Sequence, residues 1–200
     1  RTRILQENAS FMDASVAPSA IHAHSGQQSL RCICPAKSSR LVCAKASLGT
    51  GLIGFEQEDD FWFRAWFRID GGTRPFTLAD VEGRHVKESP GIRLMLFEGQ
   101  YLGAELKAMH KPKYQQSPSD RVVFPVDQWV QVTWHVYLHP DQGRVRIWQD
   151  DTLVVDETGP TLPFAGMLYS LEVGISAHSF GDKPATLFVD DIVVTTGSLR

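Results

Sequence analysis

Residues 61–69 alternate between two kinds of side chain along their whole length. The odd positions are all apolar, and the even positions are Trp62, Arg64, Trp66 and Arg68. Because successive side chains of a β-strand point to opposite faces, one face of this segment suits a hydrophobic core and the other a polar surface. The pattern therefore restricts the segment to a strand of an antiparallel sheet that is buried on one side.

Similar strand patterns recur along the chain, separated by clusters of glycine, proline, aspartate and serine. They cover residues 28–34, 41–46, 76–81, 91–97, 103–109, 129–139, 144–149, 152–156, 168–177 and 185–195. We predict an all-β fold, a two-sheet antiparallel β-sandwich of the jelly-roll type, with residues 1–200 as a single domain. Residues 28–34 and 41–46 form the first predicted hairpin, and residues 110–121 are predicted to be a long exposed loop, a kind of segment that is often functional.

The composition restricts the partners that the chain can have. A hydrophobic content of 42%, with 11 Phe and 5 Trp, is enough to fill one sizeable core. The formal net charge of -3 provides no positive field for nucleic acid. No apolar run approaches the roughly 18 residues that a membrane-spanning helix needs. We therefore expect a soluble domain with no nucleic-acid partner and no membrane span, whose oligomeric state the sequence leaves open.

The three cysteines lie on either side of the first predicted turn. In a symmetric hairpin Cys34 would face Cys43, and a disulfide would form only if the two were a non-hydrogen-bonded pair. Such a bridge would indicate an oxidising compartment and leave Cys32 as the odd thiol. The alternative is three half-buried thiols that act as small hydrophobic side chains.

The polar sides of the predicted strands carry residue types that suit sugar recognition. Aromatic faces stack on pyranose rings, and planar polar groups bind hydroxyls and carboxylates. If the strands share a sheet, their polar sides form one ligand-binding surface on which Arg64, His135 and Glu172 converge. The alternative is a solvated face on which tryptophan and arginine stack only to cover apolar surface. The predicted ligand-binding residues are Trp62, Trp66, Arg68, Gln131, Glu172 and His178.

Four segments resemble those of the concanavalin A-like lectin and glucanase superfamily. They are residues 24–31, residues 61–68, residues 129–134 with residues 145–151, and residues 187–194. The superfamily is a jelly roll shared by laminin G-like modules, legume lectins, glucanases and several polysaccharide lyases. Each segment is typical of the fold rather than of a catalytic activity, and a fold alone does not determine function.

The resemblance also implies a structural calcium ion and a location outside the cytoplasm. Several members of the superfamily hold calcium with a carboxylate of the closing strand and a residue near the N-terminus. Here Asp190 or Asp191 would be the ligand, with Asp13 or Glu7 as its partner, and oxygen ligands suit calcium. The alternative is that the two aspartates end strand pairing or cap backbone donors. An extracellular or periplasmic location is expected.

Two catalytic chemistries known on this fold can be compared with the chain. The glucanases use a Glu-x-Asp-x-Glu strand, but residues 78–82 read Leu-Ala-Asp-Val-Glu, so the first carboxylate is missing and glycoside hydrolysis is disfavoured. Polysaccharide lyases use a base, an acid and a cation that neutralises a uronate carboxylate. By resemblance, the lyase candidates are His135, Tyr137, Arg64 and Arg93, although the spacing of Gln131 and His135 differs from that of alginate lyases.

The sequence thus predicts carbohydrate binding across the concave sheet of a jelly roll, with a polysaccharide or glycan as the partner. One alternative is a polysaccharide lyase that acts by β-elimination on uronic-acid polymers. A second is a non-catalytic protein-interaction domain. Whether the protein is an enzyme stays open.

Overall fold

The computed structural model describes residues 14–36, 44–70, 76–83, 91–107, 113–178 and 183–200. Within these ranges the regular structure is entirely β, in thirteen strands. The strands are β1 (Ser15–Ser19), β2 (Ser29–Cys34), β3 (Ala44–Phe55), β4 (Asp60–Asp70), β5 (Phe76–Glu82), β6 (Gly91–Phe97), β7 (Tyr101–Leu106), β8 (Lys113–Gln115), β9 (Trp129–Tyr137), β10 (Gly143–Gln149), β11 (Thr152–Gly159), β12 (Leu168–His178) and β13 (Ala185–Thr195).

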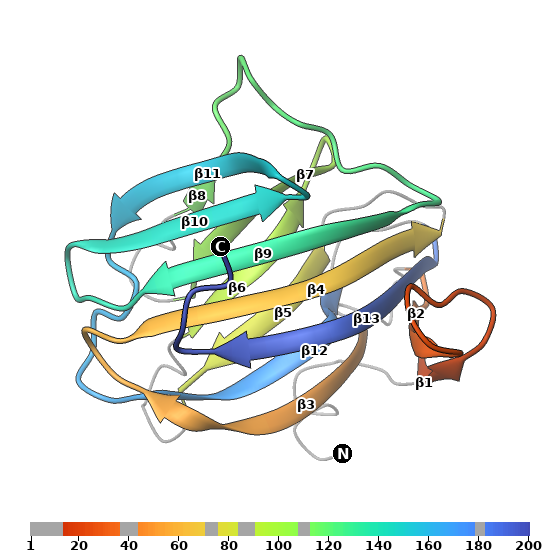
Figure 1. The fold of residues 1–200 in the computed structure, drawn as a ribbon, viewed down its shortest axis with the longest axis horizontal. Coiled ribbons are helices and arrows are strands. Elements are labelled where there is room, and N and C mark those ends of the chain that lie inside the picture. Colours follow the sequence, from red (N-terminus) through yellow and green to blue (C-terminus); the bar gives the residue numbers. More distant parts are fainter. Residues whose placement is uncertain (1–13, 37–43, 71–75, 84–90, 108–112, 179–182) are drawn as a thin grey trace.

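The strands form two antiparallel sheets that pack face to face (Figure 1). One sheet has seven strands in the order β1-β2-β13-β4-β9-β10-β11, and the other has six in the order β3-β12-β5-β6-β7-β8. Several neighbouring strands are far apart in sequence, as the pairing of β13 with β2 and β4 shows. This arrangement confirms the predicted all-β sandwich of the jelly-roll type. The described residues contain no helix long and apolar enough to cross a membrane.

The core lies between the sheets, where the alternation of β4 predicts it. Phe61, Phe63 and Phe67 are at most 1% exposed. On the neighbouring strand β9 the same alternation buries Val130, Val132 and Trp134. The six-stranded sheet supplies the opposite wall, with Leu94 of β6 and Val173 of β12 among its buried side chains. Burying one face of each sheet leaves the other face of each to form the two outer surfaces of the molecule.

The predicted hairpin of residues 28–34 and 41–46 is wrong. β2 pairs with β1 and β13 in the seven-stranded sheet, whereas β3 pairs with β12 in the six-stranded sheet. Turn-like residues indicate that the chain changes direction, but they do not select the strand that becomes the partner. Cys43 lies outside the described residues, so a bridge to Cys34 stays a prediction. Burial raises the pKa of Cys32 to about 12, which makes this thiol inert near neutral pH.

The predicted loop of residues 110–121 contains a short strand. β8 pairs with β7, and its Tyr114 is buried, with its hydroxyl donating to the Pro160 carbonyl oxygen at 2.5 Å. Three residues are too few to show a period of two, so no pattern indicates this strand. β1 is missing from the predicted set because its residues, Ser-Val-Ala-Pro-Ser, contain a proline and show no alternation of apolar and polar side chains. The long strand β3 also includes residues 49–54, which lie between the predicted strands 41–46 and 61–69.

We predict that replacing Phe67 by alanine destabilises the fold by about 3–5 kcal/mol, because a fully buried aromatic ring leaves a cavity between the sheets. Denaturant unfolding followed by tryptophan fluorescence measures the change. Val123→Ala is a suitable control, since Val123 is 58% exposed and its loss should change the free energy of unfolding by less than about 0.5 kcal/mol. Equal effects of the two substitutions would contradict this assignment of the core.

Candidate functional site

The predicted site residues are divided between the two outer surfaces. We call these surfaces the seven-strand face and the six-strand face, after the sheet that carries each. Arg64 of β4 and His135 of β9 belong to the seven-strand face, where the register places β4 beside β9. Arg93 of β6 and Glu172 of β12 belong to the six-stranded sheet. Arg64, His135 and Glu172 therefore do not converge, because alternation identifies the outward side of a strand but not the sheet to which it belongs.

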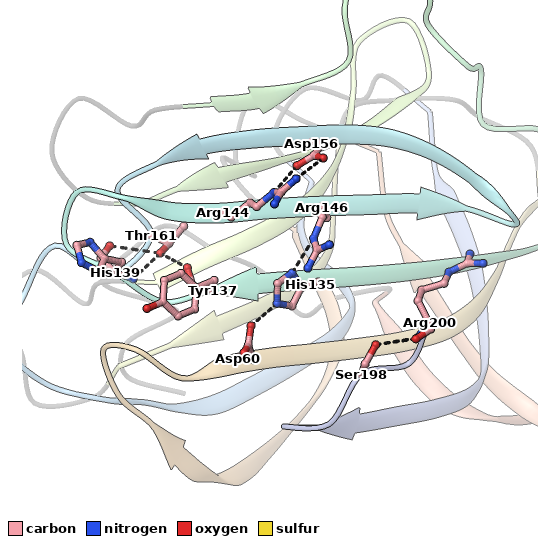
Figure 2. A network of polar contacts seen from close by, with 10 residues as sticks. All are labelled: Asp60, His135, Tyr137, His139, Arg144, Arg146, Asp156, Thr161, Ser198 and Arg200. Atoms are coloured by element: carbon pink, nitrogen blue, oxygen red, sulfur yellow. Dashed lines mark hydrogen bonds and ion pairs between the residues drawn. The ribbon is translucent and has the colours of Figure 1, made fainter.

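On the seven-strand face, His135 is enclosed by its own neighbours (Figure 2). Its Nε2 lies 2.5 Å from Asp60 Oδ1, and Arg146 Nε donates to its Nδ1 at 3.1 Å. The Trp62 ring packs against the imidazole with centroids 4.2 Å apart, and His135 is only 2% exposed. Burial lowers the pKa of His135, partly offset by the bond to Asp60, and nearby Arg146 lowers it further. The imidazole is thus held neutral, with both nitrogen atoms already bonded.

The aromatic rings of the seven-strand face are also covered. Trp62 is 6% exposed, and the Arg146 guanidinium lies 5.8 Å from its ring centre. The His24 ring stacks on Trp66 with centroids 3.8 Å apart. Arg200, in the C-terminal segment that crosses this sheet, lies 5.4 Å from the Trp148 ring centre (Figure 1). These contacts agree with the alternative in which tryptophan and arginine cover apolar surface.

The other predicted residues of this face make contacts of their own. Arg68 pairs with Asp70 at 2.8 Å and donates to the Asp127 carbonyl oxygen. The Tyr137 ring stacks beside His139, and the Gln131 backbone amide donates to Asp150 Oδ1 at 2.9 Å. In Figure 2, Tyr137 lies near His135 on the same side of the sheet, as the alternation predicts. A catalytic role for His135 and Tyr137 stays a prediction.

Asp190 and Asp191 bind a loop near the N-terminus, at His24 and Ser25. Asp190 accepts hydrogen bonds from the backbone amides of His24 at 2.9 Å, Ser25 at 3.2 Å and Asp191 at 2.9 Å. Asp191 accepts from the Ser25 hydroxyl at 2.5 Å and lies 2.7 Å from His24 Nδ1, and these contacts lower its pKa.

Oxygens surrounded by N–H and O–H donors do not fit a calcium ion, which needs those lone pairs. The described ranges hold no group of three or more His, Cys, Asp or Glu arranged around a common metal position. Calcium held with Asp13 or Glu7 stays a prediction, because both residues lie outside the described ranges.

The six-strand face carries a cluster of paired charges that sequence reasoning did not assemble. The register places Asp80 of β5 opposite Arg93 of β6, and Arg93 opposite Glu105 of β7. Arg93 donates to Glu105 Oε1. Lys107, just beyond β7, has its Nζ 3.0 Å from each oxygen of Asp80 and also donates to Glu82. We call these five residues, Asp80, Glu82, Arg93, Glu105 and Lys107, the charged cluster.

The charged cluster is sheltered although it lies on an outer surface. Asp80 is 7% exposed and Glu105 is 6% exposed. Burial raises the pKa of Asp80 to about 6, against the opposing effect of Lys107, and the like charge of Glu82 raises it as well. A carboxyl group with this pKa can both accept and release a proton near neutral pH. Perturbed titratable groups of this kind gather at functional sites more often than elsewhere.

Two of the predicted residues extend or belong to the charged cluster. Arg93 is a member, and Glu172 lies in register with Asp80 on the neighbouring strand. The Ser47 hydroxyl donates to Glu172 at 3.3 Å, and Lys45 lies 4.0 Å away. His178 pairs with Ala44 through its backbone, and its side chain is not described. Asp80 and Glu82 belong to the charged cluster but are not among the predicted site residues. The sequence does contain a signal for them, since they are two residues apart and so share one face of a strand.

No family model matches the chain, and no curated protein matches it in sequence. Solved structures with the same fold are numerous. An endo-β-1,4-glucuronan lyase from the fungus Trichoderma reesei superposes with a TM-score of 0.72 at 13% identity, covering 92% of this chain and 87% of that one. The cellulose-induced protein Cip1 superposes at 0.69 with 18% identity, covering 92% and 86%. Alginate lyase Aly36B superposes at 0.61 with 10% identity, covering 92% and 87%.

These likenesses establish the class of fold. The chain has a concanavalin A-like jelly roll of the kind found in polysaccharide lyases, which confirms the resemblance seen in its sequence segments. At sequence identities of 18% and below, the likeness shows only that the fold is shared.

We predict that Asp80→Asn changes how stability depends on pH. The pKa of Asp80 is raised in the folded protein, to about 6 from 3.8, so its contribution to the free energy of unfolding falls as pH rises from about 4 to about 6. The asparagine variant lacks this fall. Between about pH 4 and about pH 7, the difference in free energy of unfolding between the variant and the wild type should therefore shift by about 2–3 kcal/mol in favour of the variant. Denaturant unfolding across this range measures it.

His135→Gln is a control with the opposite sign. Because burial lowers the pKa of folded His135, the unfolded chain binds a proton more readily, and stability is lost as pH falls below about 6.5. The glutamine variant should show less of that loss. If the Asp80 variant followed the pH dependence of the wild type, Asp80 would have an ordinary pKa.

Proposed function

We propose that this protein binds a polysaccharide across the six-strand face, with the charged cluster at the centre of the site. The observation that carries the proposal is a set of five charged side chains that are paired and sheltered on the outward side of a sheet. Arg93 and Lys107 can donate hydrogen bonds, while Asp80, Glu82 and Glu105 can accept them. Sugar hydroxyls need both kinds of partner, and side chains fixed by mutual ion pairs lose little entropy on binding.

The contrast with the seven-strand face supports this choice. On the seven-strand face the imidazole nitrogens and the indole rings are already occupied by neighbouring side chains. On the six-strand face, β3 contributes Gly49 and Gly51 beside β12, so little side chain projects there. The solved structures of the same fold include a glucuronan lyase and alginate lyases, named for polymers of uronic acids. A polysaccharide partner also implies that the protein works in the extracellular space or the periplasm.

We predict that Lys107→Gln weakens polysaccharide binding about tenfold or more, because charge-assisted hydrogen bonds contribute about 1.5–3 kcal/mol each. Titration calorimetry with a panel of acidic and neutral polysaccharides measures the affinity. Arg64→Gln is the matched control, since Arg64 is a half-buried cation on the opposite outer surface. Circular dichroism establishes that both variants are folded. Loss of binding with Arg64→Gln, and none with Lys107→Gln, would move the site to the seven-strand face.

A polysaccharide lyase is the second candidate function, favoured by the contact between Asp80 and Lys107. In β-elimination a base removes the proton from the carbon next to the uronate carboxylate. The electron pair left behind forms a carbon–carbon double bond as the bond to the leaving oxygen breaks, and that oxygen gains a proton. In this scheme Arg93 would exchange its partner Glu105 for the substrate carboxylate. Ionised Asp80 can accept the first proton, and protonated Lys107 can supply the second. Every proton in the scheme then has a donor and an acceptor within the charged cluster.

We expect that, if the protein is a lyase, uronic-acid polymers yield products whose new double bond absorbs in the ultraviolet. Asp80→Asn should abolish that signal and His135→Gln should preserve it. The reverse result would support the catalytic role predicted for His135 and Tyr137. If the wild type forms no product from any polymer it binds, it is a binding domain. If it binds no polysaccharide in the panel, a protein-interaction domain becomes the better hypothesis.

A further inference from the structure

A second group of side chains on the six-strand face combines stacked aromatic rings with exposed cations. Phe97 of β6 and Tyr101 of β7 are register partners, and their rings stack with centroids 5.6 Å apart. Lys113 Nζ lies 5.6 Å from the Phe97 ring centre, and the Arg121 guanidinium lies 4.0 Å from the Tyr101 ring centre. We call these four residues the basic aromatic corner.

The corner lies on the same outward side as the charged cluster. Phe97 and Tyr101 are each four residues along their strands from Arg93 and Glu105, so the two pairs are separated by about 13 Å. Lys113 stands opposite Glu105 in the register between β7 and β8. The corner is therefore a continuation of the proposed site along β6 and β7, and not a separate surface.

The cations of the corner are incompletely neutralised. Among the described residues, Lys113 forms an ion pair only with Glu105, at 3.9 Å, and Glu105 is already bonded to Arg93. Arg121 has no ion pair within the described ranges, where the neighbouring Asp120 accepts instead from the Ser119 hydroxyl. Glu98 beside Phe97 is exposed and likewise forms no ion pair there. Lys113 and Arg121 are therefore two cations of which neither has a close carboxylate partner of its own among the described residues.

We propose that the basic aromatic corner is a distal subsite that takes an anionic sugar of the bound polysaccharide, with Lys113 and Arg121 pairing with its acidic group. The inference rests on the proposed function of the six-strand face. Both cations lie over buried rings, which reduces their freedom to move and keeps them near one position. A polymer held at the charged cluster and running along β6 and β7 would place a later sugar at the corner. The corner would then select for polymers that carry charge along their length.

The test uses the whole protein with Lys113→Gln and Arg121→Gln combined. The control combines Lys183→Gln and Arg144→Gln, which removes the same charge at exposed positions outside the corner. The probes are an acidic uronic-acid polymer, the same polymer with its carboxyl groups reduced, and the shortest acidic oligosaccharide that the wild type binds. We expect the corner variant to bind the acidic polymer about tenfold more weakly, with a shallower dependence on salt. Its affinity for the short oligosaccharide and for the reduced polymer should match that of the wild type.

Each other outcome overturns the inference. Unchanged affinity for the acidic polymer would mean that the two cations only shield the rings. If the corner variant lost as much affinity for the reduced polymer, the two cations would act by packing. If the control variant lost as much affinity for the acidic polymer, the effect would come from the overall charge of the protein. In all three cases binding that still depends on Lys107 would leave the proposed function intact. If the wild type binds none of the probes, the proposed function and this inference both fail.

Discussion

The packing of two apolar sheet faces is the interaction on which the rest of the structure depends. Once Phe61, Phe63 and Phe67 enter the space between the sheets, every even-numbered residue of β4 must face outward. The register with β9 then places Trp62 beside His135 and Trp66 beside Gln131. The same rule on the six-stranded sheet brings Asp80, Arg93 and Glu105 into one row across three strands. Both outer surfaces are thus consequences of how the core is filled.

Alternation along one strand could be predicted from the sequence, and the partnership between strands could not. The core side of β4, β9 and β12 follows from a period of two, and the predicted limits of β6 and β13 are those of the structure. Alternation alone groups Arg93 and Glu172 with His135, because nothing local distinguishes a strand of one sheet from a strand of the other. The burial of Asp80 also depends on chain segments far away in sequence. Because burial is what raises its pKa, that pKa could not be predicted from residues 78–82.

The two outer surfaces satisfy their polar groups in different ways. On the seven-strand face the partners of His135 come from β4 and β10, and aromatic rings fill the space above the sheet. That arrangement consumes the groups that could otherwise contact a ligand. On the six-strand face the polar groups are paired mainly as ions, with Lys107 shared between two carboxylates. A shared cation can exchange one partner for a ligand group while keeping the other, so this surface can rearrange at lower cost.

Stability alone is a poor reason for a protein to keep the charged cluster. Ion pairs removed from water recover their desolvation energy only in part, and apolar side chains of similar volume often do as well or better. Burial already raises the pKa of Asp80 above its usual range, so the folded protein pays a free-energy cost to keep that carboxyl ionised near neutral pH. Groups held at such a cost are typical of sites where a ligand or a proton transfer uses them. The cluster is therefore better explained by binding, or by chemistry on a bound sugar, than by its contribution to the fold.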